Sequence, residues 1–278
     1  MQKTKQVVVI GVVGALVAVL LAQPIKGLVN DKEEAQTSAP TANSSEFNLE
    51  NVSQMSKQGL NSSLIEEISD IEAQITKSSA EEKVSLLQQL ADKWDDLAKP
   101  APQGFVYEEM AKTSPKLEYW LKAGQAYRAA YTNLQDTTLA QSLNQNAIRA
   151  FENAVKLDGS NLDAKTGLGA AMVSGTNNPM AGIALLREVV AADPKNIEAN
   201  KTLGLFSLQS RQFDKAIERF KTVIALKPDA ESYFYLATGY ENIGLKNEAI
   251  AAFQQAKQLA ADPTLSQFID RRIEELSK

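Results

Sequence analysis

The stretch Tyr233–Pro263 reads YFYLATGYENIGLKNEAIAAFQQAKQLAADP and decides the fold. Its first half places three residues three or four positions apart, on one face of a helix: Leu236, Ala237 and Tyr240. Gly244 ends that helix. The second half marks one face of another helix, which Pro263 stops, with Ala249, Phe253 and Ala256. The stretch therefore predicts a unit of two helices joined by a short turn.

The same unit recurs towards the amino terminus at steps of 33 to 35 residues. The small residue early in its second helix appears as Ala147, Gly182, Ala216 and Ala249. A bulky residue follows four positions later, as Phe151, Leu186, Phe220 and Phe253. Three positions further on stands a residue expected to pack closely against the neighbouring helix, as Ala154, Val189, Val223 and Ala256. This pattern resembles the tetratricopeptide repeat, a helix–turn–helix of about 34 residues. The resemblance implies an all-α solenoid of helical hairpins.

The repeat predicts the layout of most of the chain. We expect an array over 84–263, made of five repeats at 84–116, 117–160, 161–196, 197–229 and 230–263. The first of these is degenerate, because Gln103 stands where the repeat expects alanine. A capping helix and turn at 63–83 precede the array, with helix-capping boxes at Ser63–Glu66 and Ser79–Glu82. An amphipathic capping helix at 264–278 follows it.

The second repeat is too long for the family. From Gly124 to Ala147 it has eleven more residues than the same interval in the fourth repeat, or about three helical turns. The added segment carries several large apolar side chains: Tyr131, Leu134, Leu139 and Leu143. It either packs on its own repeat or offers a surface to a partner or to a second copy of the chain.

The amino terminus predicts a membrane anchor within residues 1–29. Lys3 and Lys5 precede Val7–Ala22, which is 16 uncharged apolar residues and spans roughly 24 Å as a helix. Cleavage after Ala22 would place Leu20 at the −3 position, where a signal peptidase prefers a small residue. We therefore favour an uncleaved signal anchor over a cleaved signal peptide. The positive flank then stays in the cytoplasm, which predicts a single-pass protein of a bacterial inner membrane with its body in the periplasm.

Residues 30–62 are rich in polar and acidic residues and predict a flexible linker. Four apolar residues interrupt this composition: Phe47, Leu49, Val52 and Met55. They form a short docking motif or are incidental to a linker.

The composition excludes several kinds of chemistry. The formal charge is −5 with a pI of about 5.1, and no basic stripe points to nucleic acid. The chain has no Cys and no His, which removes thiol nucleophiles, zinc fingers and histidine bases. Asp92, Asp95 and Asp96 share one helical face and predict a solvated or partner-facing surface. We expect no catalytic residues, no metal site and no cofactor, and hence a protein that is not an enzyme.

The resemblance implies a binding groove lined by the first helices of successive repeats. Its positions fall on Lys122, Gln125 and Arg128 in the second repeat, on Lys201, Thr202 and Gln209 in the fourth, and on Phe234, Tyr235, Thr238, Glu241 and Asn242 in the fifth. Some members of the family clamp a terminal carboxylate with Lys, Asn and Arg, but the third repeat offers Thr166, Ala170 and Val173 instead. We therefore expect a mixed aromatic and polar groove for a peptide or helix. Alternatively, Phe234 and Tyr235 pack between neighbouring repeats.

Together these features predict a membrane-anchored scaffold that recruits a protein partner in the cell envelope. The layout is similar to that of membrane-anchored tetratricopeptide-repeat subunits of the bacterial Sec translocon and of repeat-containing accessories of cytochrome c maturation. The alternative is a holdase or translocon or assembly accessory that binds unfolded polypeptides. Suppression of aggregation favours the holdase, and one stoichiometric partner favours the scaffold.

Overall fold

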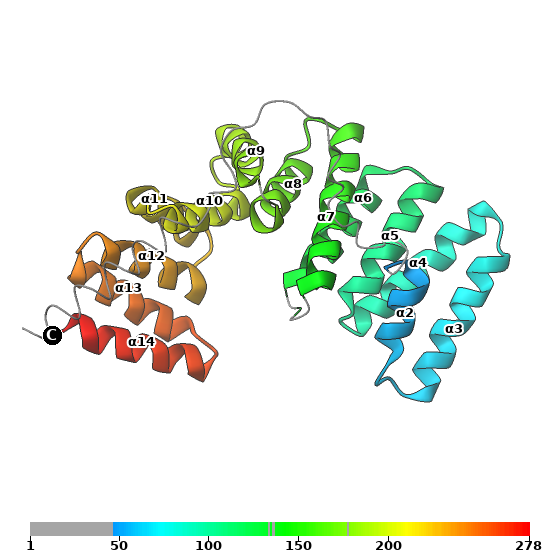
Figure 1. Ribbon diagram of the computed structural model, residues 1–278, viewed down its shortest axis with the longest axis horizontal. Helices are drawn as coiled ribbons and strands as arrows, with labels where there is room; N and C mark the ends of the chain where they lie inside the picture. Colours follow the sequence, from blue (N-terminus) through cyan, green and yellow to red (C-terminus); the bar gives the residue numbers. More distant parts are fainter. Residues whose placement is uncertain (1–46, 133, 135–136, 177) are drawn as a thin grey trace, which may run out of the picture. The chain divides into compact units, whose positions relative to one another are not determined.

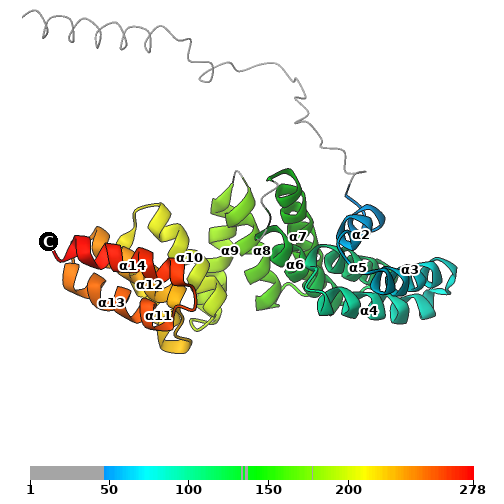
Figure 2. The same cartoon turned by 90° about the horizontal axis from the view of Figure 1, so that it is seen from below.

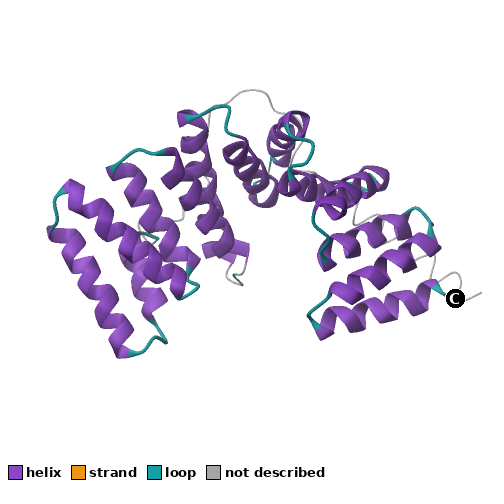
Figure 3. Ribbon diagram, turned by 180° about the vertical axis from the view of Figure 1, so that it is seen from behind, coloured by secondary structure: helices purple, strands orange, loops and turns teal. Residues whose placement is uncertain are grey.

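The computed structural model describes residues 47–132, 134, 137–176 and 178–278, and this part of the chain is all-α. It contains thirteen helices and no strand (Figure 3). In chain order these are α2 (Leu49–Lys57), α3 (Ser62–Lys77), α4 (Ala80–Asp96), α5 (Pro100–Thr113), α6 (Leu117–Thr132), α7 (Thr137–Leu157), α8 (Leu162–Gly175), α9 (Pro179–Ala192), α10 (Ile197–Gln209), α11 (Phe213–Leu226), α12 (Ala230–Asn242), α13 (Lys246–Leu259) and α14 (Pro263–Leu276).

Helices that follow one another in the chain pack as hairpins (Figure 1). The pairs are α4–α5, α6–α7, α8–α9, α10–α11 and α12–α13. Each hairpin also contacts the next, since the second helix of one pair packs on the first helix of the following pair. The expectation of an all-α chain of helical hairpins is confirmed.

The positions that define the repeat lie in the core. The small residues of the second helices are all buried, at Ala147, Gly182, Ala216 and Ala249. The bulky residues four positions later are at most 1% exposed, at Phe151, Leu186, Phe220 and Phe253. Gly124 shows why the first helix carries a small residue opposite them, because a Cβ there would lie 2.7 Å from the Phe151 ring. The period of the sequence is therefore the period of helix–helix contact.

The amino-terminal end differs from the expected linker. Residues 49–57 form α2, whose amino terminus is capped by the side chain of Asn48. This helix lies beside α5 (Figure 2). Val52 is buried, and the Nζ of the buried Lys57 lies 2.5 Å from a carboxylate oxygen of Glu72 in α3. The linker prediction is wrong for residues 47–62, because tertiary packing orders a segment whose composition is mostly polar. Residues 30–46 and the predicted anchor at 7–22 lie outside the described part.

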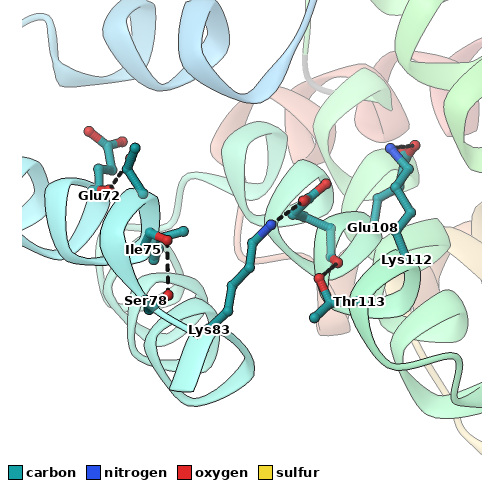
Figure 4. Close-up of polar contacts among 9 residues, drawn as sticks. Glu72, Ile75, Ser78, Lys83, Glu108, Lys112 and Thr113 are labelled. Atoms are coloured by element: carbon teal, nitrogen blue, oxygen red, sulfur yellow. Dashed lines mark hydrogen bonds and ion pairs between the residues drawn. The ribbon is translucent and has the colours of Figure 1, made fainter. Parts of the chain in front are cut away.

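Helix caps and an ion pair stabilise α3, α4 and α5. Asn61, and not the expected Ser63, caps α3 by accepting from the backbone N–H of Leu64. Ser79 and Glu82 do form the expected capping box of α4. Figure 4 shows Lys83 of α4 reaching towards α5, where it pairs with Glu109 at 2.7 Å.

The long second repeat packs on the hairpin that follows it. Leu143 of α7 is fully buried, and Tyr131 and Leu139 pack against the same core cluster. The buried Asn144 donates from Nδ2 to the backbone carbonyl of Ala171 in α8, at 3.2 Å. The added turns therefore support α8, and Leu134 is an exposed apolar side chain of this segment.

The last helix covers the carboxyl-terminal end of the array. Ile269 of α14 is fully buried, and Leu265, Ile273 and Leu276 pack against the same cluster. Among the described helices, none is both long and apolar enough to cross a membrane.

Candidate functional site

A cavity of about 320 Å³ opens between the first helices of three successive repeats. Its walls come from α6, α8 and the start of α10, and one residue of α7 reaches into it. The lining residues are Gln125, Arg128, Phe151, Asp163, Thr166, Gly167, Lys195, Asn196, Ile197 and Glu198. Two of the eleven expected groove residues, Gln125 and Arg128, are therefore at this cavity.

The helices come this close because α8 carries glycine where it meets α7. A Cβ at Gly167 would overlap the ring of Phe151. Because this ring also faces Gly124 of α6, it fills the space between two glycines from neighbouring first helices. The Phe151 ring, which is 1% exposed, therefore packs α6 and α8 together beneath the cavity.

An ion pair between Arg128 and Glu198 joins α6 to α10 across the cavity. Nη1 of Arg128 donates to a carboxylate oxygen of Glu198, a residue 70 positions away in the sequence. Nε of the same guanidinium is buried and has no hydrogen-bond partner in the described structure. Glu198 lies in the first turn of α10, where a negative charge is favoured by the helix dipole.

Other polar groups at the cavity are open to solvent. Gln125, Asp163 and Lys195 are exposed, and none of them takes part in an ion pair within the described residues. Thr166 is buried and donates to the Leu162 carbonyl at 2.7 Å, so its hydroxyl hydrogen is already used. The site thus combines amide, cationic, anionic and apolar surface.

Lys122 lies on α6 but outside this cavity. Its Nζ is 2.7 Å from Glu118 and 5.4 Å from the centre of the Tyr107 ring in α5. The hydrogen bond to Glu118 raises the pKa of Lys122. Lys122 therefore contacts its own helix and the second helix of the preceding repeat.

The expected residues of the fourth repeat lie along α10. Lys201 pairs with Asp229 at 3.0 Å and with Glu231 at 3.4 Å. Burial opposes the charge of Lys201, but hydrogen bonds and attraction to these carboxylates outweigh it and raise the pKa of Lys201. Burial likewise opposes the charge of Asp229, whose pKa is nevertheless lowered by hydrogen bonds from Ser232 and Lys201. Thr202 and Gln209 are part-buried and exposed, respectively.

The expected residues of the fifth repeat face their neighbours in the array. Tyr235 stacks on Phe220 of α11 with ring centres 5.3 Å apart. The Phe234 ring lies 5.6 Å from Phe253 and 5.8 Å from Phe268 of α14. The structure therefore agrees with the alternative that these two aromatics pack between neighbouring elements.

The polar residues in the second half of α12 also have partners within the chain. Glu241 pairs with Arg272 of α14. Thr238 donates to the Phe234 carbonyl at 2.9 Å, and Asn242 donates to the Thr238 carbonyl at 2.8 Å. The eleven expected residues thus lie on three first helices, α6, α10 and α12, and two of them, Gln125 and Arg128, line the cavity.

Sequence reasoning missed most of the cavity. Lys195, Asn196, Ile197 and Glu198 belong to the turn and first residues of α10, whereas the family's groove positions lie along the helices. Asn196 caps α10 by accepting from the Ala199 N–H, which places Glu198 in the first turn. That cap was readable in the sequence, but the contact of Glu198 with α6 was not.

Two segments of the chain match family models of the tetratricopeptide repeat, at residues 176–238 and 230–263. Residues 176–263 carry tetratricopeptide repeats. No curated protein is significantly similar to this chain. Among solved structures, MamA 41-end from Desulfovibrio magneticus RS-1 is 21% identical with a TM-score of 0.50, covering 63% of this chain and 94% of its own. This likeness supports the fold alone.

Two further solved structures are similar with lower TM-scores. A crystal structure of MamA is 26% identical with a TM-score of 0.48, covering 61% of this chain and 93% of its own. YrrB, described as a tetratricopeptide-repeat protein with an unusual peptide-binding site, is 16% identical with a TM-score of 0.47, covering 72% and 97%. Tetratricopeptide repeats in general mediate protein–protein interactions, and residues 176–263 of this chain match that family.

Proposed function

We propose that this chain is a non-enzymatic scaffold, anchored in a bacterial inner membrane, that recruits a partner protein by an extended peptide or helix. The partner binds at the cavity between α6, α8 and α10. The observation that carries this proposal is the cavity itself, which combines the part-buried apolar side chain of Ile197 with exposed polar groups of both charges.

The chemistry of the cavity suits a polypeptide. A peptide backbone brings one N–H donor and one carbonyl acceptor per residue, and the site offers partners for both. The amide of Gln125 donates and accepts, Lys195 donates, and Asp163 accepts. Ile197, which is part-buried, supplies apolar contact for a side chain. Small-molecule sites are usually more enclosed and more apolar than this one.

The proposed anchor is residues 7–22, and the positive charges of Lys3 and Lys5 favour an orientation with the repeats outside the cytoplasm. Anchoring confines the repeats near the membrane surface. A partner in the same membrane then meets them at a high effective concentration, so modest affinity at the cavity suffices.

A photo-crosslinker placed at Gln125 tests the binding site in cells that express the full chain. We expect adducts dominated by one protein, and far fewer adducts from a matched crosslinker at Glu218, an exposed residue of α11. Equal labelling from the two positions, or no adduct from Gln125, contradicts the proposal. Many heterogeneous adducts, together with suppression of aggregation of a denatured protein, support the holdase alternative.

Alkaline extraction of the same membranes tests the anchor. The full chain should stay in the membrane pellet and yield a peptide from its first 22 residues in mass spectrometry. A soluble chain that lacks those residues shows that the segment is cleaved.

A further inference from the structure

Helix α2 is attached largely through polar contacts. Only three of its residues are buried, namely Val52, Ser53 and Lys57. The Ser53 hydroxyl donates to one carboxylate oxygen of Glu72 in α3, and Nζ of Lys57 donates to the other, each at 2.5 Å. Nζ of Lys57 also donates to the Ser69 hydroxyl at 3.1 Å. A buried ion pair adds little net stability, because the lost hydration of both charges offsets their attraction. These contacts therefore specify where α2 lies but contribute little to the strength of its attachment.

Helix α2 does not fill the groove in which it lies. A cavity of about 500 Å³ separates it from part of α3, where Ala73 and Ile75 face Gln54 of α2. A second cavity, of about 350 Å³, lies between the start of α2 and α5, where Phe105 contributes to the wall. Leu49 of α2 lines both cavities. A helix with larger apolar side chains would therefore bury more surface in this groove than α2 does.

The connection after α2 allows it to leave the groove without uncapping the next helix. Residues 58–61 join α2 to α3, and the side chain of Asn61 caps α3 without help from α2. With α2 absent, the groove would present the Glu72 carboxylate without its two α2 donors, together with the apolar side chains of Ile75 and Phe105. A lysine suits such a surface, because its stem is apolar and its end carries a positive charge.

We propose that the groove between α3 and α5 is a docking surface for an amphipathic helix of a partner protein, and that α2 is its internal competitor. The partner helix carries a lysine that pairs with Glu72. Three positions before this lysine it carries a large apolar side chain, which takes the place of Gln54 and fills the cavity at Ala73 and Ile75. This surface belongs to other helices than the cavity between α6, α8 and α10, so either proposal can fail without the other.

Fluorescent peptides that span residues 47–60 serve as probes for binding to the full chain. A probe with Gln54→Leu represents the partner helix and should bind about tenfold more tightly than the native sequence, because leucine adds apolar contact in the cavity. Adding Lys57→Met to this probe should weaken its binding at least tenfold, because Glu72 is then left without a cation. Met55→Gln is the matched control in the probe, since Met55 is 51% exposed and lines neither cavity, and it should change nothing.

Two variants of the full chain test the competition. Val52→Ala shortens a buried side chain of α2 and leaves Glu72 intact, so the Gln54→Leu probe should bind this chain at least threefold more tightly than wild type. Gln54→Leu in the full chain strengthens the internal competitor and should weaken binding of the same probe. Circular dichroism checks that both variants keep their helix content.

Three outcomes overturn the inference. The first is that the Gln54→Leu probe fails to bind the Val52→Ala chain, and the second is that it binds equally well without its lysine. The third concerns a second copy of the chain as the occupant. If a mixture of isotopically labelled and unlabelled wild-type chains gives a carbodiimide crosslink between Lys57 of one copy and Glu72 of another, α2 exchanges between copies. A crosslink confined to single chains, with the expected order of probe affinities, supports the proposal. Crosslinking from Gln125 reports on the proposed function separately.

Discussion

Replacing Gly167 by alanine tests whether close packing of α8 on α7 builds the candidate site. Helix propensity alone predicts a gain from this change, because alanine is favoured over glycine in a helix interior by about 1 kcal/mol. Tertiary packing predicts a loss, because the new Cβ would overlap the ring of Phe151. The two effects have opposite signs, so the measured sign decides between them.

The size of the loss follows from how little the ring can move. Phe151 is 1% exposed, and the same end of its ring, Cε1 and Cζ, also faces Gly124, where a Cβ would be only 2.7 Å away. Inserting a methyl group into a filled core costs about 1–3 kcal/mol, and a ring held between two helices belongs at the upper end. After subtracting the propensity gain, we expect Gly167→Ala to destabilise the chain by about 2 kcal/mol.

The assay compares urea unfolding of the full chain with amide hydrogen exchange along α7 and α8. Local exchange is needed because repeat arrays depart from two-state unfolding, and the effect should concentrate in these helices. Gly159→Ala is the matched control, since its nearest neighbour would be the Val155 carbonyl at 3.7 Å. That variant should lie within about 0.5 kcal/mol of wild type.

A double variant separates the clash from other causes. Phe151→Leu removes ring atoms at the point of overlap, so Gly167→Ala should cost less in that background than in the wild type. If Gly167→Ala is as stable as Gly159→Ala, or if its cost is the same with leucine at position 151, the reasoning about this contact is wrong.

Three further substitutions test other contacts. Asp229→Asn keeps a good cap for α12 but removes the ion pair with Lys201. Because folding lowers the pKa of Asp229, its negative charge stabilises the fold at pH values above its unfolded pKa of about 3.9. The difference in unfolding free energy between wild type and Asp229→Asn should therefore shrink as the pH falls below that value, which urea unfolding at a series of pH values measures. Ile269→Ala empties a fully buried site in α14 and should cost about 2–5 kcal/mol, seen as faster hydrogen exchange in α12 to α14 with little change in α4 to α6. Lys57→Met leaves Glu72 without its cation and should release α2, which limited proteolysis between α2 and α3 reports; unchanged cleavage would show that the pair does not hold this helix.

The core could be predicted from the sequence because burial in a repeat array is periodic. Ala147, Gly182, Ala216 and Ala249 stand at nearly equal steps, and each is buried at a helix crossing. One unit suffices to find the others, because equivalent positions of every repeat make the same helix–helix contacts. The fold class follows from these positions without any long-range information.

The amino-terminal helix α2 could not be predicted in this way. Its segment is mostly polar, and only three of its residues are buried. One of these is Lys57, whose burial depends on Glu72 in another helix. Lysine is rarely buried without a partner, so the sequence alone predicts that it is solvent-exposed unless its partner is known.

The candidate site was partly hidden for the same reason. The positions of Gln125 and Arg128 follow from the repeat, but the pairing of Arg128 with Glu198 joins helices from two repeats that are not neighbours in sequence. Periodicity states which residues of a first helix face outward. It does not state which charges of other repeats meet them.

These cross-repeat pairs change how the charges on the first helices should be understood. Arg128, Lys201 and Glu241 each form an ion pair with a residue outside their own helix, so a ligand that binds one of these charges must compete with that ion pair. A bound polypeptide gains only the difference between the new pairing and the one it replaces, and that difference is small for exposed ion pairs. Selectivity must then come from geometry. Weak exchange contacts of this kind suit a scaffold whose partner is already concentrated beside it, which the proposed anchor would provide.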